Sequence, residues 1–128
     1  MSGATDSMIT GVEVISRPAL AATVPDVLDA DGYLLGTPAN IGYMSGALKH
    51  FFDLIYYPCL EATVGRPFSY YVHGNNDTTG AVRAIESIAR GLRWRQAQQG
   101  VSVVGSPSAT DLSACREIGA ALAAGLVL

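Results

Sequence analysis

Two short polar segments of the sequence, residues 37–46 and 73–80, contain the residue types best suited to bind a small molecule. The first holds Asn40 and Gly42, and the second holds Gly74 followed by two asparagines. An amide side chain offers donors and an acceptor together, and a glycine lets the backbone approach a ligand closely. Residues 73–80 also lack any side chain that would belong to a hydrophobic core. The chemistry that these segments favour is therefore hydrogen-bonded recognition of a ligand.

The cysteines and histidines do not point to a metal site. Cys59 and Cys115 fall on different predicted helices, with no C-x-x-C motif and no metal-like spacing to His50 or His73. We interpret both cysteines as buried free thiols, because cysteine is among the most buried residue types. A disulfide or a catalytic thiol is the alternative interpretation.

The two polar segments must be positioned by the apolar runs and amphipathic stretches that flank them. Runs of β-branched and aromatic residues predict strands, and apolar residues at helical spacing predict helices. Pro58 should end or kink one of these helices because it lacks a backbone donor. In chain order we expect a strand at residues 12–16, a helix at 25–30, a buried central strand at 32–36, a helix from 46 to 58, a strand at 68–72, a helix after residue 80, a strand at 101–104 and a helix at 111–126.

This alternation is typical of a parallel α/β sheet with helices on both faces. In such sheets ligands bind beyond the carboxyl ends of the strands. Each polar segment directly follows a predicted strand, so we expect the two segments to meet at this edge. Asp77 or Thr78 should cap the helix that follows the second segment. The inward residues of the last helix should be Leu112, Cys115, Ile118, Leu122 and Leu126.

Composition indicates one folded domain over residues 1–128. The chain is 49% hydrophobic and 15% charged, with a net charge of −3. This charge gives no attraction toward nucleic acid or anionic lipid. The longest apolar stretch, residues 118–128, is far shorter than the roughly 20 residues of a membrane-spanning helix. With no signal-like amino terminus either, we expect a cytoplasmic protein.

The string from Gly36 to Asp53, GTPANIGYMSGALKHFFD, resembles the flavodoxin-like NAD(P)H-dependent FMN and quinone reductases. The likeness extends more loosely over residues 12–104. In that family the first loop and a second loop hold the flavin ring from two sides. By this resemblance the FMN-binding residues here are Thr37, Pro38, Ala39, Asn40, Ile41, Gly42, Tyr43 and Met44 of the first loop, and His73, Gly74, Asn75 and Asn76 of the second.

The resemblance also implies a reaction. Electrons would pass from NAD(P)H through FMN to a quinone or similar acceptor, and a homodimer is compatible with it because the two loops leave one face of the flavin open. Hydride transfer is the chemistry of the cofactor, so we assign no general base and no nucleophile. The alternative is a flavodoxin-like module without catalytic activity that does not retain FMN.

The sequence departs from the family where FMN phosphate is bound. Family members open with a strand and a Ser/Thr- and Gly-rich loop that wraps the phosphate at a helix amino terminus. Here eleven residues precede Val12, and residues 1–8 contain no apolar run; residues 106–110 are rich in hydroxyl groups but follow the wrong strand. We therefore expect a three-layer flavodoxin-like fold whose first strand-loop-helix unit is missing or incomplete.

Three explanations fit this gap. The start codon is assigned too far downstream, or strand 12–16 pairs directly with strand 32–36, or a partner chain completes the sheet.

The roles of His73 and of two arginines stay open. His73 either touches the ligand or is an ordinary turn histidine, and Arg83 with Arg90 either binds the NADPH phosphate or forms part of a solvated helix face, which explains these two residues more simply.

Overall fold

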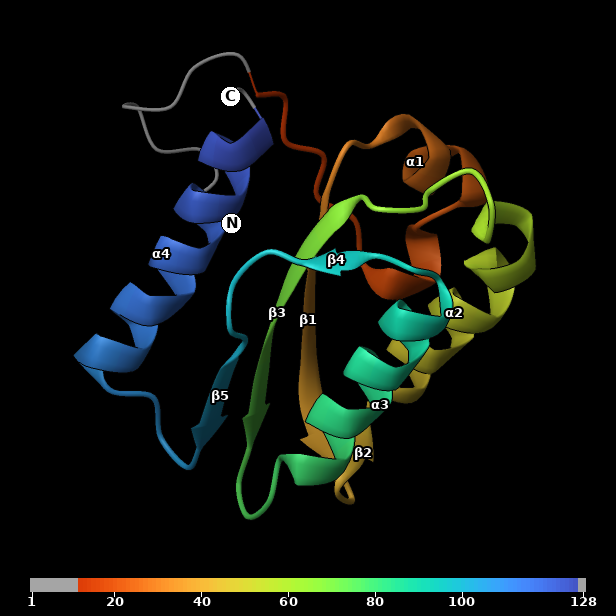
Figure 1. Cartoon of the computed structure of the whole chain (residues 1–128). Helices are drawn as coiled ribbons and strands as arrows, with labels where there is room; N and C mark the ends of the chain where they lie inside the picture. Colours follow the sequence, from red (N-terminus) through yellow and green to blue (C-terminus); the bar gives the residue numbers. More distant parts are fainter. Residues whose placement is uncertain (1–11, 127–128) are drawn as a thin grey trace.

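The predicted succession of helices and strands is present from residue 24 onward in the computed structural model, which describes residues 12–126 (Figure 1). Two short strands and one helical turn that the sequence did not predict are added to it. In chain order the elements are η1 (Ala19–Ala21), α1 (Val24–Asp29), β1 (Tyr33–Asn40), β2 (Tyr43–Met44), α2 (Gly46–Cys59), β3 (Pro67–Gly74), α3 (Thr79–Gly91), β4 (Arg95–Gln96), β5 (Val101–Val104) and α4 (Ala109–Leu126).

The sheet is parallel apart from one hairpin. β3 pairs with β1 on one side, from Tyr33 opposite Phe68 to Pro38 opposite His73, and with β4 and then β5 on the other. β2 folds back antiparallel onto the end of β1. Because β1 and β3 run side by side and in the same direction, their carboxyl ends lie at one edge of the sheet. β3, rather than the expected residues 32–36, is the central strand of the parallel part.

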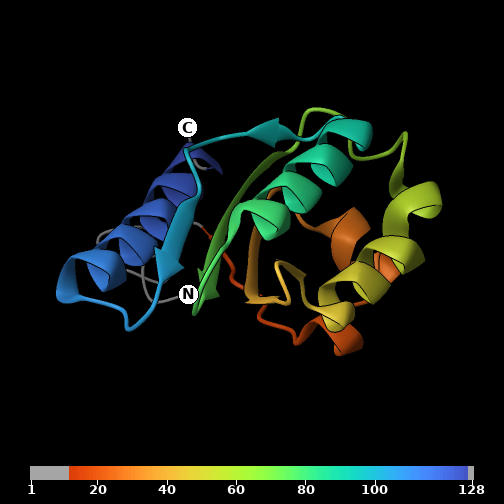
Figure 2. The same ribbon diagram turned by 90° about the horizontal axis from the view of Figure 1, so that it is seen from below.

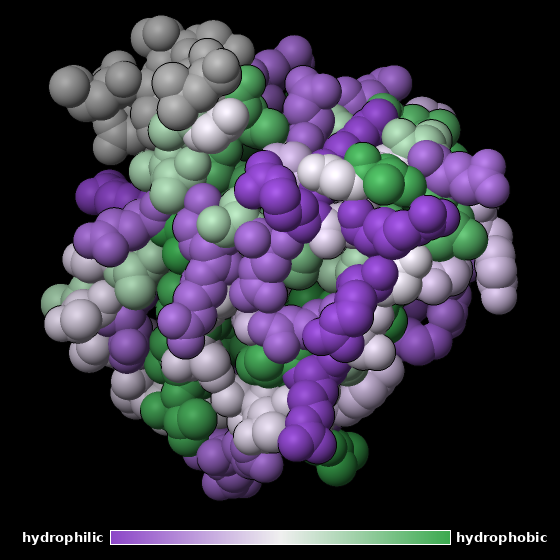
Figure 3. Space-filling model, viewed as in Figure 1, coloured by the Kyte–Doolittle hydropathy of each residue, from purple (hydrophilic) through white to green (hydrophobic). Residues whose placement is uncertain are grey.

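Helices cover the two faces of the sheet, as predicted. Figure 2 shows α2 and α3 on one side of the sheet and α4 on the other. The core between the sheet and α2 and α3 includes Leu35, Phe68 and Val72 from the strands, and Phe52 and Ile85 from the helices. Hydrophilic side chains gather over α3 on the face shown in Figure 3, because only one stripe of this helix is apolar.

The strand predicted at residues 12–16 is absent. Val12 and Val14 are half-buried and Glu13 and Ile15 are exposed, so the side chains alternate as in a strand, but this segment pairs with no strand of the described chain. A β-branched sequence favours extended backbone, yet a strand also requires a neighbour that supplies its hydrogen bonds. The direct pairing of residues 12–16 with residues 32–36 is therefore wrong.

The last helix also differs from its predicted pattern. Ile118 and Leu122 are buried as expected, whereas Leu112 is 63% exposed and Cys115 is only half-buried. α4 packs against both β3 and β5, and its buried residues, Ile118, Gly119, Leu122 and Ala123, all lie in the second half of the helix. Cys59 is buried and both cysteines are free thiols.

Among the described residues, no helix is both long enough and apolar enough to cross a bilayer.

Pro58 lies next to the last residue of α2, so this helix ends where the proline was expected to stop it.

One arginine joins the end of α1 to the start of β3. Nη1 of Arg66 lies 3.1, 2.8 and 2.7 Å from the carbonyl oxygens of Val27, Leu28 and Ala30, and 3.2 Å from Oη of Tyr33. The last carbonyls of a helix have no partner within it, and a cation satisfies them well. The guanidinium therefore holds the amino end of the sheet together.

Replacing Arg66 with methionine should lower the free energy of unfolding by about 2 kcal/mol, the usual contribution of hydrogen bonds to a charged group. Urea denaturation measures this change. Arg90→Met, on the exposed side of α3, is the control and should change stability by less than about 0.5 kcal/mol. Equal stabilities of the two variants would contradict the role of Arg66.

Candidate functional site

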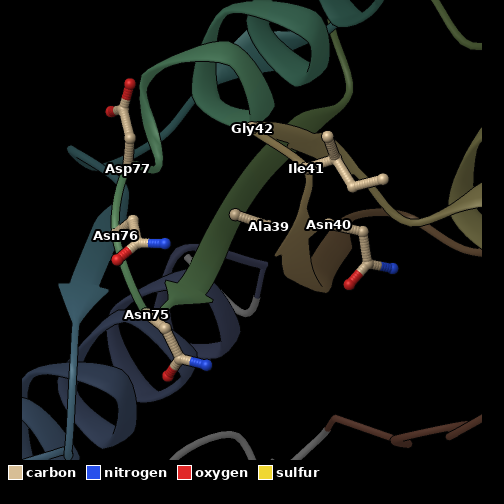
Figure 4. Close-up of a pocket in the computed structure, with 7 residues that line it drawn as sticks. All are labelled: Ala39, Asn40, Ile41, Gly42, Asn75, Asn76 and Asp77. Atoms are coloured by element: carbon tan, nitrogen blue, oxygen red, sulfur yellow. The ribbon is translucent and has the colours of Figure 1, made fainter.

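A cavity of about 700 Å³ lies at the carboxyl ends of β1 and β3. Its volume falls within the roughly 300–1,000 Å³ of small-molecule sites. Figure 4 shows the residues around it, which come from the two predicted polar segments. The lining residues are Ala39, Asn40, Ile41 and Gly42 on one side and Asn75, Asn76 and Asp77 on the other.

The first wall is a tight hairpin between β1 and β2. Asn40 pairs with Tyr43 across a two-residue turn, Ile41 and Gly42, whose φ angles are 50° and 74°. Positive φ at both positions is the pattern of a type I′ turn, which asparagine and glycine prefer. Isoleucine is β-branched and strongly disfavoured there. The turn therefore holds a fully exposed apolar side chain at the rim of the cavity at a cost in backbone strain.

Two contacts hold this hairpin in place. Oγ1 of the buried Thr37 accepts a hydrogen bond from the backbone N–H of Ser45 at 2.9 Å and donates one to the carbonyl of Pro38 at 2.8 Å. The first turn of α3 packs against the hairpin at Gly80, where a Cβ atom would overlap the carbonyl oxygen of Gly42. The absence of a side chain at Gly80 thus sets how close α3 lies to the turn.

The second wall is fixed by backbone contacts at the end of β3. Gly74 is buried and lies against Ala39, and its carbonyl accepts a hydrogen bond from the N–H of Gly105 at 2.7 Å. Oδ1 of Asp77 accepts a bond from the N–H of Thr79 at 2.9 Å. This backbone hydrogen bond holds the pKa of the Asp77 carboxyl below its ordinary value, so the group is charged at neutral pH.

Six of the twelve predicted binding residues line this cavity. Asn40 and Asn75, from segments 35 positions apart in the sequence, reach the same cavity, and their side chains extend in the same direction in Figure 4. The carboxyl group of Asp77, which also lines the cavity, points the other way in this view. The six lining residues are Ala39, Asn40, Ile41, Gly42, Asn75 and Asn76.

The other six predicted residues lie around the cavity rather than along it. Thr37, Met44 and Gly74 are buried, and Pro38 is exposed on β1. Tyr43 lines a neighbouring shallow groove on α3 together with Arg83. Nε2 of His73 lies 2.5 Å from the carbonyl oxygen of Gly105, to which it donates a hydrogen bond, so its imidazole faces the loop after β5.

Sequence reasoning missed two residues of the site. Asp77 was expected only as a helix cap, and its Oδ1 does accept the N–H of Thr79, the first residue of α3, whereas the side chain of Thr78 makes no capping bond. Gly80 was not assigned a role. The position of Gly80 in the sequence could have revealed its packing role. A glycine in the first turn of an otherwise regular helix weakens that helix, so its presence there calls for a packing reason.

The cavity suits the ring of a flavin better than its phosphate. The amides and the close backbone at Gly42 match a flat apolar body with donors and acceptors at its rim. A phosphate calls for cations or free N–H groups. No lysine or arginine lines the cavity within residues 12–126, and Asp77 is its one ionisable side chain. Among the same residues, no cluster of histidine, cysteine and carboxylate side chains could hold a metal.

Comparison with known proteins supports the sequence resemblance. The family model for NADPH-dependent FMN reductase matches residues 8–109. No curated protein matches the chain.

Several solved structures share the fold. A WrbA-like flavodoxin from Agrobacterium tumefaciens is 18% identical with a TM-score of 0.74, and the match covers 95% of this chain and 81% of that one. The two-electron reduced flavodoxin of Megasphaera elsdenii is 21% identical with a TM-score of 0.75, over 95% and 83% of the two chains. The apo form of an NADH:FMN oxidoreductase is 19% identical with a TM-score of 0.65, over 80% and 57%. The fold is therefore flavodoxin-like.

Proposed function

The chain belongs to the NADPH-dependent FMN reductase family, and from this premise we propose that the cavity between residues 39–42 and 75–77 holds a flavin ring through which electrons pass from NAD(P)H to a quinone or similar small acceptor. The observation that carries the proposal is the convergence of Asn40 and Asn75 on one cavity at the carboxyl ends of adjacent parallel strands. Sheets of this kind bind their ligands at that edge.

The residues of the cavity would make different kinds of contact with the flavin ring. The amides of Asn40, Asn75 and Asn76 offer donors and acceptors to the polar rim of the ring. Ile41 offers an apolar surface, and Gly42 allows the backbone to approach. When bound, the flavin supplies the group that accepts and passes on a hydride, while the protein supplies its orientation and electrostatic surroundings. No side chain is assigned as a base or nucleophile.

The second candidate is a flavodoxin-like module without catalytic activity. It is favoured by the absence of any lysine or arginine along the cavity in the described chain, because a cofactor held by its ring alone is lost more easily. The homodimer expected from the resemblance stays a prediction, to be checked by gel filtration of the purified chain.

Titration of the purified chain with FMN, followed by flavin fluorescence, tests the proposal. Asn40→Leu and Asn75→Leu should each weaken binding by about tenfold, since each leaves polar groups of the ring unpaired. Gln99→Leu, at an exposed position, is the matched amide control and should leave the dissociation constant unchanged.

Addition of NADPH under anaerobic conditions then separates the two candidates. Bleaching of the visible flavin band supports the reductase, and a band that persists supports the module. Full-strength FMN binding by both asparagine variants would rule out this cavity as the flavin site.

A further inference from the structure

The charges around the cavity oppose a phosphate group. Asp77 is ionised at neutral pH, for the reason given above, and is one of the residues that line the cavity. No cationic side chain accompanies it in the lining among residues 12–126. Residues 1–11 contribute no lysine or arginine to the sequence. The whole chain carries a net charge of −3, so longer-range electrostatics do not favour an anion either.

The helix amino termini near this edge are already occupied by the chain itself. A helix amino terminus can bind phosphate through its free N–H groups. At α2, Oγ of Ser45 accepts a hydrogen bond from the N–H of Leu48 at 3.1 Å. At α3, the carboxylate of Asp77 takes the N–H of Thr79. The amino termini of α2 and α3 therefore already bind side-chain oxygens of the chain, and the oxygen at α3 belongs to a charged carboxylate.

The hydroxyl-rich stretch after β5, residues 106–110, also has side-chain oxygens bound to backbone N–H groups at a helix amino terminus. Oγ of Ser108 accepts a bond from the N–H of Asp111 at 3.1 Å, and the carboxylate of Asp111 accepts one from the N–H of Ser108 at 2.9 Å. This reciprocal pair is a capping box, which places a carboxylate at the amino terminus of α4. A dianionic phosphate would meet a like charge there.

The other basic side chains near this edge have other partners or positions. Nζ of Lys49 pairs with the carboxylate of Asp53 at 2.6 Å. The imidazole of His73 donates to the carbonyl of Gly105. Arg83 lines the separate groove beside Tyr43. None of these three side chains lines the cavity at the ends of β1 and β3.

We infer that this cavity recognises the isoalloxazine ring and gains nothing from the phosphate, so that the chain binds riboflavin about as tightly as FMN. The inference rests on the proposed function, because it concerns the same cavity and the same ring. It widens the ligand class from FMN to flavins in general, with selectivity set by the amides at residues 40, 75 and 76 and by the turn at Ile41.

Parallel titrations of the unaltered chain with riboflavin and with FMN, at low and high sodium chloride, test this inference by flavin fluorescence. The two dissociation constants should agree within about threefold, and salt should leave FMN binding unchanged or tighten it, because salt screens repulsion. FMN binding at least tenfold tighter than riboflavin binding, and weakened by salt, would overturn the inference while the proposed function stands. Binding of neither flavin would overturn both.

Asp77→Asn provides a second readout. Asparagine retains the Oδ1 that accepts from Thr79 and removes only the charge. The affinity for FMN should rise by about two- to threefold relative to that for riboflavin, the size of a screened charge interaction near a surface. Asp29→Asn, at the exposed end of α1, changes the net charge equally and should leave the ratio of affinities unaltered. An equal change for both flavins in Asp77→Asn would show an effect on the ring and contradict the inference.

Discussion

Replacing Gly80 with alanine is expected to weaken flavin binding by at least about tenfold and to lower the free energy of unfolding by about 2 kcal/mol, a typical cost of forcing extra volume into a packed contact. A methyl group at this position would overlap the carbonyl oxygen of Gly42. Either α3 or the turn at Ile41 and Gly42 must then move, and the first wall of the cavity moves with it. Urea denaturation and flavin titration measure the two effects.

Gly125→Ala is the matched control for this variant. Gly125 lies in α4 with open space where a Cβ would be. Alanine there should raise the free energy of unfolding by up to about 1 kcal/mol, because glycine is a poor helix former. It should leave flavin binding as it is. If Gly80→Ala stabilised the chain as Gly125→Ala does, the contact between α3 and the turn would not exist.

Replacing Ile41 with asparagine is expected to have opposite effects on stability and binding. Asparagine adopts positive φ readily in type I′ turns, so the free energy of unfolding should rise by about 1 kcal/mol. Flavin binding should weaken by about tenfold, because an apolar side chain that covers a ligand contributes about 1.5–3 kcal/mol. Strained residues persist where function requires their side chain. The same denaturation and titration experiments measure both changes.

Ile41→Leu separates strain from contact. Leucine keeps an apolar side chain of the same size without the branch at Cβ. The variant should bind flavin within about twofold of the original chain, as expected for a swap that conserves apolar volume. Flavin binding by Ile41→Asn at full strength would show that this side chain does not touch the ligand, and the strain at the turn would need another explanation.

The sequence predicted the elements whose periodicity is strong. The apolar stripe through Leu48, Phe52 and Ile55 and the aromatic run of β3 both gave the correct type of element. It also predicted that the two polar segments meet, because parallel strands bring their carboxyl ends to one edge. That rule places Asn40 near Asn75 without any knowledge of side-chain positions.

What the sequence could not show depends on partners distant in the chain. β1 continues through Pro38 to Asn40, although a proline usually marks the end of a strand. Such a residue is tolerated where an edge is unpaired, and in the described chain residues 33–38 pair with β3 alone. The hairpin strand β2 has two residues, too few for a periodic pattern. Residues 12–16 have the composition of a strand but no neighbour, which composition cannot reveal.

Because of the hydrogen bonds of the Arg66 guanidinium, the amino end of the sheet is held more rigidly than its carboxyl end. It ties the backbone of α1 to the start of β3 through residues 36 to 39 positions away in the sequence. The opposite end carries a two-residue turn and a short polar loop, whose anchors are a few single hydrogen bonds and a glycine contact. The turn and the loop can therefore move to admit a ligand while the strands keep their register.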